Sequence, residues 1–196
     1  MIYGIITLMN NSNDKEGEKV FMVLRDKDVF PNTPEATEVV DIVWKVRPTG
    51  KVVLFNEENK IALMGNKVNT FLLLPGGGID DNESILDGIT RECQEETGCK
   101  IELQKTLGVT EDFRLRDSRH CISFGFSAKV ISYGTPSLTE NEADIGAYVK
   151  WLSLPEAIEL LTAQEEKVKN GEVKFYNTCF NTIRDSFFAK KAKDLY

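Results

Sequence analysis

Histidine and cysteine, the side chains that most often hold zinc, are scarce in this sequence. The chain has one histidine, His120, and four cysteines. The cysteines are far apart and form no CxxC pair; they are Cys93, Cys99, Cys121 and Cys179. Because zinc sites need closely spaced Cys and His ligands, this distribution disfavours a zinc site, and we expect reduced, partly buried thiols.

Long apolar runs are also missing. No stretch approaches the roughly 18 to 20 consecutive apolar residues that a membrane-spanning helix needs. The first residues lack the basic segment, apolar segment and cleavage site of a secretion signal. We therefore expect no membrane association and a cytoplasmic protein.

Basic residues form no run of five or more, and the formal net charge is −7. Stable nucleic-acid binding is not expected from such a chain, because affinity for nucleic acids depends mainly on clustered positive charge. An acidic protein also repels polyphosphates, so an enzyme that acts on them needs metal cations or a local basic patch. The charge therefore favours a metal site.

The chain has 196 residues, of which 41% are hydrophobic and 28% charged, and this fits one folded domain with an appended segment. Residues 2–9 and 19–24 are β-prone and are separated by a polar, turn-rich stretch, which predicts a hairpin with a long loop. Residues 26–36 contain two prolines and no clear period, which predicts a linker. We therefore expect an N-terminal extension at residues 1–37 and a domain at residues 38–196.

Within that domain, the sequence alternates between strand and helix patterns. Runs rich in β-branched and aromatic residues predict strands at 39–47, 50–55, 60–64, 71–74, 100–110, 120–133 and 148–152. A helix is predicted to begin near Ser84, which has capping-box spacing to Asp87, and to end at Gly98. Two further amphipathic helices are predicted at 154–161 and 175–193.

The helix that follows Ser84 carries a concentration of acidic residues. At about 100° per residue, one side of this helix should pack on the sheet, and that side holds Ile85, Leu86, Ile89 and Cys93. Glu92 and Glu96 project along its margin, with Glu95 further around. Such carboxylates repel one another, and a hard divalent cation such as Mg²⁺ would relieve the repulsion while also binding phosphate oxygens. A carbonyl of the adjoining glycine loop, residues 76–78, could complete its ligand shell.

An alternative interpretation is a solvated acidic face on which Arg91 pairs with Glu95 and Asp87. An isolated helix with two adjacent glutamates would favour it. The three glycines shift the balance, because they permit positive φ and a close approach of ligand to backbone. By themselves they are weak evidence, since they match neither the dinucleotide nor the P-loop pattern.

Residues Gly77 to Cys99 resemble the box of the Nudix hydrolases, G-x5-E-x7-R-E-U-x-E-E-x-G-U, where U is a bulky aliphatic residue. The fixed positions are filled by Gly77, Glu83, Arg91, Glu92, Glu95, Glu96 and Gly98. The U positions hold Cys93 and Cys99, which are small hydrophobes and should loosen the packing only slightly. A looser resemblance extends from about residue 39 to 161. It implies an α/β (α+β) fold, an α/β/α sandwich around a mixed sheet, with the N-terminal β-hairpin outside it.

The resemblance further implies a metal-dependent hydrolase that cleaves a phosphoanhydride bond in a nucleoside diphosphate derivative or a nucleoside triphosphate. Ligands of Mg²⁺ or Mn²⁺ would be Glu92, Glu95 and Glu96, with Gly77 in the metal-binding loop. Gly78 would lie beside it in the substrate loop. Arg91 would orient a neighbouring glutamate, although a direct phosphate contact stays open, and Glu83 would be scaffolding.

The general base is less defined. Glu92 is one candidate, and the acidic loop of Glu140, Glu142 and Asp144 offers others, of which we favour Glu142. The same loop would also suit a solvated surface. His120 begins an apolar strand and is expected to be structural or exposed, and Phe113, Arg114 and Arg116 have no assigned role.

The main alternative function is a non-catalytic, nucleotide-sensing Nudix-like domain. Such domains typically have lost one or more glutamates of the box, and here all are present. A non-hydrolytic Nudix enzyme would need further acid–base residues that the sequence does not identify. An N-terminal protein-interaction module is a third alternative. The resemblance implies a small-molecule nucleotide partner and a homodimer.

Overall fold

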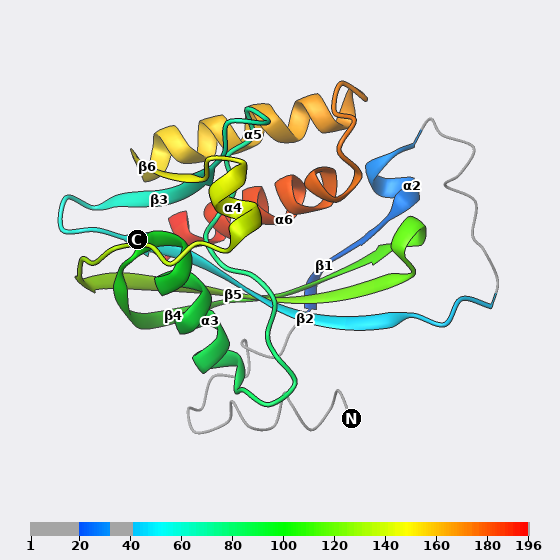
Figure 1. Cartoon of the computed structure of the whole chain (residues 1–196). Coiled ribbons are helices and arrows are strands. Elements are labelled where there is room, and N and C mark those ends of the chain that lie inside the picture. Colours follow the sequence, from blue (N-terminus) through cyan, green and yellow to red (C-terminus); the bar gives the residue numbers. More distant parts are fainter. Residues whose placement is uncertain (1–19, 32–40, 196) are drawn as a thin grey trace.

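The computed structural model describes residues 20–31 and 41–195. A mixed six-stranded sheet forms its centre, in the order β1-β4-β5-β2-β3-β6 (Figure 1). The strands are β1 (Val20–Arg25), β2 (Lys45–Phe55), β3 (Lys60–Gly65), β4 (Lys100–Arg114), β5 (Arg119–Ser132) and β6 (Tyr148–Ser153). The helices are α2 (Asp26–Val29), α3 (Ile85–Thr97), α4 (Glu140–Asp144), α5 (Leu154–Lys169) and α6 (Tyr176–Lys193), with a 3₁₀ turn η3 (Leu115–Asp117). No helix in the described ranges is both long and apolar enough to cross a membrane.

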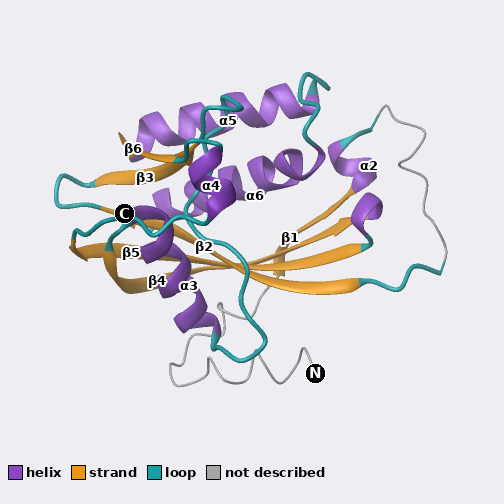
Figure 2. Ribbon diagram, viewed as in Figure 1, coloured by secondary structure: helices purple, strands orange, loops and turns teal. Residues whose placement is uncertain are grey.

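Helices cover both faces of the sheet, so the predicted sandwich is confirmed (Figure 2). Side chains alternate between the faces along β2. Val52 and Leu54 pack in the core under α3, whereas Val53 and Phe55 pack in the core under α5 and α6. Burial on both faces explains why the second half of β2 is an unbroken apolar run.

The ends of α3 lie where the sequence predicts them. Ser84 is the N-cap, and its hydroxyl accepts from the Asp87 N–H at 3.1 Å and donates to the Asp87 carboxylate at 2.7 Å. Gly98 ends the helix in the left-handed region, at φ 73°. One expected core residue is wrong: Leu86 is 45% exposed, because it lies about 100° around the helix from the buried Ile85.

The predicted interruption of β2 at residues 48–49 is wrong. One strand runs from Lys45 to Phe55 and pairs in parallel with β5 along its whole length. Pro48 is tolerated there because a loop, and not another strand, lies along the opposite edge: the Ile79 N–H donates to the Pro48 carbonyl at 3.1 Å. The part of the predicted strand at residues 39 and 40 lies outside the described residues.

The predicted strand at residues 71–74 is also wrong, since only an isolated bridge between Met64 and Leu73 forms there. Side chains from the helices bind this segment instead. The Gln164 side chain accepts from the Leu72 N–H and donates to the Leu72 carbonyl, both at 2.8 Å. Asp185 accepts from the Leu74 N–H at 2.9 Å. These contacts satisfy the backbone groups that a neighbouring strand would have bound.

Both C-terminal helices are present, and α5 continues well beyond the predicted end at residue 161. It reaches Lys169 because Gln164 and Val168 continue its buried face. The short helix α4 was not predicted, although Thr139 and Glu142 form a capping box at its start.

The N-terminal segment contributes to the sheet. The second predicted strand of the hairpin is β1, which pairs in parallel with β4, whereas residues 2–9 lie outside the described part of the chain. The prediction of a linker over residues 26–36 is wrong at its start, because α2 forms and the Tyr176 hydroxyl donates to the buried Asp26 at 2.7 Å. The boundary at residue 37 falls among residues that are not described and stays a prediction.

Replacing Gln164 by Met should test how the segment before the glycine loop is held. The substitution leaves the Leu72 N–H and carbonyl unpaired in a buried position. We expect the free energy of unfolding, measured in urea, to fall by about 2–4 kcal/mol. The exposed Gln104→Met variant is the control and should unfold like the wild type. An unchanged midpoint for Gln164→Met would show that the contact does not stabilise the fold.

A pH-dependent contribution to stability is expected where α5 meets α6. Burial alone raises the pKa of Glu165, but hydrogen bonds from Lys169 (2.6 Å), Lys190 (2.9 Å) and Ser186 (2.7 Å) outweigh it and lower the pKa to about 2. A lowered folded-state pKa stabilises the protein above the ordinary value of 4.5, and this stability is lost as the pH falls towards 2. The Glu165→Gln variant should therefore be less stable than the wild type at pH 7, with a difference that shrinks below about pH 5. Urea unfolding at pH 7, 5 and 3 measures this, and a constant difference would contradict it.

Candidate active site

Residues 75–79 lie along β2 as an irregular neighbour. The Gly50 N–H donates to the Gly77 carbonyl at 2.9 Å, and the Val52 N–H donates to the Pro75 carbonyl at 3.0 Å. Gly76 has φ +116°, and a side chain there would also overlap the Gly50 carbonyl. Only glycine fits this position, so the sequence fixes the loop close to the sheet.

Two carboxylates of α3 contact this loop. The Gly76 N–H donates to Glu96 Oε2 at 2.6 Å. A Cβ built on Gly77 would overlap the carboxylate of Glu92, which shows how closely the backbone approaches that group. Glycine at position 77 therefore allows the loop and the acidic side of α3 to meet.

Both carboxylates are held in an unfavourable environment. Burial raises the pKa of Glu92, and the charge of Glu95 raises it further, against the lowering effect of Arg91. Burial likewise raises the pKa of Glu96, as does the charge of Glu92, whereas Lys51 lowers it. A divalent cation would favour the ionised form of both groups.

Arg91 connects the acids to the loop. Its guanidinium binds Glu83 at 2.6 and 3.1 Å, Glu92 at 2.9 Å and Glu95 at 3.1 Å, and it also donates to the Gly78 carbonyl at 3.2 Å. Glu83 in turn accepts from the Asp80 N–H at 2.8 Å. Arg91 therefore orients its neighbours, and Glu83 fastens the turn that leads into α3.

In the structure, the three glutamates of the box have different hydrogen-bond partners. Arg91 binds Glu92 and Glu95, and the Gly76 N–H binds Glu96. Accordingly, the described residues include no group of three or more His, Cys, Asp or Glu side chains that could hold a metal ion. The chemistry of the donors nevertheless fits a hard divalent cation, because two desolvated carboxylates lie beside the carbonyls of a glycine loop.

Sequence reasoning missed Lys51, which is buried under the loop. Its ammonium group donates to the carbonyl of Leu74 at 2.9 Å and to that of Gly76. Burial lowers the pKa of Lys51, although the charges of Asp185, Glu96 and Glu92 oppose this effect. A basic side chain thus contacts the backbone carbonyls of the loop.

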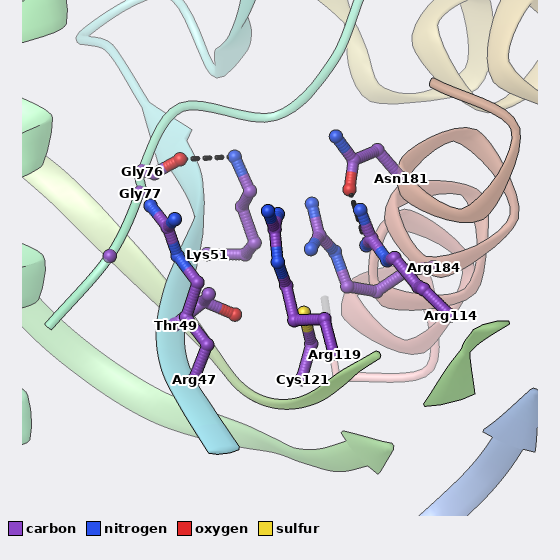
Figure 3. A pocket seen from close by; sticks show the side chains of 11 residues that line it. Arg47, Thr49, Lys51, Gly76, Gly77, Arg114, Arg119, Cys121, Asn181 and Arg184 are labelled. Atoms are coloured by element: carbon purple, nitrogen blue, oxygen red, sulfur yellow. Dashed lines mark hydrogen bonds between the residues drawn. The ribbon is translucent and has the colours of Figure 1, made fainter. Parts of the chain in front are cut away.

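Lys51 belongs to a basic pocket of about 160 Å³, whose side chains point towards one another between β2, β5 and α6 (Figure 3). One wall is the glycine loop, residues 76–78. Five cationic side chains line the pocket: Arg47, Lys51, Arg114, Arg119 and Arg184. The sequence does contain a signal for part of it, because Arg47, Thr49 and Lys51 alternate along β2 and must share one face.

The remaining predicted site residues lie further away. Glu142 accepts from the N–H and the hydroxyl of Thr139, both at 2.8 Å, but it lies near enough to raise the pKa of Glu96. Glu140 and Asp144 are exposed. His120 pairs with Glu111 at 2.8 Å, outside the site.

The residues without an assigned role separate into two groups. Phe113 stacks on His120 with ring centroids 4.1 Å apart, and Arg116 lies 4.6 Å over the ring of Tyr176. Arg114, in contrast, lines the basic pocket. Its buried guanidinium contacts Asp112 at 2.5 Å.

Comparison with known proteins gives the same family as the box. The NUDIX domain family matches residues 38–177. An ADP-ribose pyrophosphatase of Methanocaldococcus jannaschii is 33% identical over 81 residues, which are 40% of this chain and 48% of that protein. This chain thus spans about half the length of that relative.

The crystal structure of a MutT protein from Methanosarcina mazei Go1 has a similar fold. It superposes with a TM-score of 0.52 at 19% identity, over 79% of this chain and 99% of that chain. This likeness supports the sandwich architecture described above.

Substituting Gly77 by Ala should displace the Glu92 carboxylate, because the new Cβ would overlap it. At Gly78 the nearest atom to an added Cβ is the flexible end of Arg47, at 3.0 Å, so Gly78→Ala should leave Glu92 in place. Crystal structures of both variants measure this. An undisturbed Glu92 in Gly77→Ala would show that the loop has more room than the structure gives it.

Proposed function

The chain belongs to the Nudix hydrolase family, and from that premise we propose that it cleaves a phosphoanhydride bond in a nucleoside diphosphate derivative or a nucleoside triphosphate. The observation that carries the proposal is the contact between the glycine loop and the two desolvated carboxylates, Glu92 and Glu96. A solvated acidic face would not be buried against backbone. A nucleotide-sensing domain without activity is the alternative, and it does not require every glutamate of the box.

We assign Glu92, Glu95 and Glu96, with a carbonyl of Gly77, as the groups that would hold Mg²⁺ or Mn²⁺. When bound, the metal would polarise phosphoryl oxygens and lower the pKa of the attacking water. Arg91 would keep Glu92 and Glu95 in position through its hydrogen bonds. Substitution of Arg91 should therefore lower activity by releasing Glu92 and Glu95 from these positions.

The residues around the loop supply the rest of the chemistry. Lys51, which donates to the Gly76 carbonyl, would offset the negative charge of the phosphates. We place the proton acceptor at Glu142, with Glu92 as the second candidate. Glu142 would accept the proton only after approaching the loop, since one of its oxygens caps α4 in this structure.

ADP-ribose is the first substrate to test, because the relative from Methanocaldococcus jannaschii is an ADP-ribose pyrophosphatase. Nucleotide sugars, dinucleotides and nucleoside triphosphates complete a panel assayed for phosphate-containing products with and without Mg²⁺ or Mn²⁺. Turnover of at least one compound only in the presence of metal supports the proposal. Nucleotide binding without any turnover would favour the sensing domain.

Glu96→Gln should lower kcat by at least about a hundredfold, because it removes a charged metal ligand next to the loop. The fold should be retained, since the amide oxygen can still accept from the Gly76 N–H. Steady-state kinetics on the best substrate and urea unfolding measure the two effects. Glu159→Gln, on the exposed face of α5, is the matched control and should behave like the wild type. Near wild-type turnover in Glu96→Gln would falsify the metal role.

A further inference from the structure

We propose that the basic pocket beside the glycine loop binds a phosphate monoester that the substrate carries in addition to the scissile diphosphate. The inference rests on the proposed function and names the class of substrate. It concerns residues of β2, β4, β5 and α6, none of which belongs to the Nudix box.

The pocket holds arginine donors that the protein itself does not use. The side chain of Arg47 is exposed and makes no hydrogen bond or ion pair in the described part of the chain. The side chain of Arg119 has only a distant ion pair with Asp117, at 3.5 Å, and makes no hydrogen bond to the described residues. A guanidinium carries five N–H donors in a planar fork, so two sets of donors stand open at this pocket.

The inner part of the pocket is fixed. Arg114 and Arg184 are 3% exposed. Arg114 is held by Asp112 and by Asn181, the latter at 2.9 Å, and Arg184 is held by Asp185 at 2.8 Å. Ordered arginines within a framework of this kind lose little conformational freedom when an anion binds.

The size and the lining select the bound group. About 160 Å³ is well below the roughly 300–1,000 Å³ of pockets that enclose a whole drug-sized ligand, so the pocket receives one part of a substrate. Among the described residues that line it, none has an aromatic ring on which a base could stack. Several arginines suit a group with more than one negative charge, and a phosphate monoester carries about −1.5 to −2 at pH 7, against −1 for a carboxylate.

The charge of the whole chain strengthens this selection. At a formal net charge of −7, the protein as a whole repels anions. A local concentration of arginines therefore attracts an anion to this pocket and not to the surface in general. The glycine loop lines this pocket and also contacts Glu92 and Glu96. A phosphate held in the pocket would therefore lie next to the bond that the acids of α3 serve to cleave.

Matched pairs of substrates that differ by one phosphate test the proposal. The pairs are NADH and NADPH, ADP-ribose and its 2′-phosphate, and 3′-dephospho-coenzyme A and coenzyme A. We expect kcat/KM for the phosphorylated member to be at least about tenfold higher in one pair or more. Arg47→Gln should reduce that ratio towards one. Lys129→Gln removes an exposed charge at the far end of β5 and should keep the ratio.

A second measurement does not depend on hydrolysis. Inorganic phosphate, titrated calorimetrically without metal, should bind the wild type at least about tenfold more tightly than Arg47→Gln or Arg119→Gln. Absence of turnover with every compound would reject the proposed function, whereas the titration would still measure the affinity of the pocket for phosphate. Equal kcat/KM within every pair, or phosphate binding that ignores both arginine substitutions, would overturn the inference.

Discussion

The site depends on the attachment of one irregular segment, residues 74–79, to the edge of β2. This segment forms no strand of its own, and three groups from β2 and α6 hold it. The backbone of β2 binds it at Gly77, the ammonium of Lys51 binds it at Gly76, and Asp185 of α6 binds it at Leu74. Since each of these groups is buried, an unattached loop would leave them without partners and would lower the free energy of unfolding of the whole domain. The position of the acids relative to the loop follows from this attachment.

The helix α3 and the positions of its glutamates could be predicted because the sequence features that define them are local. Ser84 and Gly98 define the ends of α3 by capping, and the spacing of Glu92 and Glu96 places them on one side of it. The two cysteines at the aliphatic positions of the box also behave as small hydrophobes. Cys93 and Cys99 are 0% and 2% exposed, and burial raises the pKa of Cys93 to about 12, which leaves an inert thiol.

The rest depends on contacts between distant parts of the sequence. Nothing in the sequence near Pro48 indicates that β2 continues through it by pairing with β5. Likewise, nothing near residues 71–74 indicates that the side chain of Gln164 will bind the backbone there in place of a neighbouring strand. The partners of the three glutamates could not be predicted either, because the Gly76 N–H that binds Glu96 lies 20 positions before it in the sequence. The basic pocket gathers side chains from position 47 to position 184, so its membership is visible only once the sheet and α6 are in place.

The bond between Asp26 and Tyr176 joins residues that are 150 positions apart. On a ribosome, α2 therefore leaves the exit tunnel long before Tyr176 has been synthesised. The same holds for β1, which lies at one end of the strand order. Contacts of such long range slow folding and prolong the exposure of unpaired strand edges. The anchoring of β1 and α2 thus depends on α6, and a nascent protein that stalls before residue 176 would lack the contact between Tyr176 and Asp26.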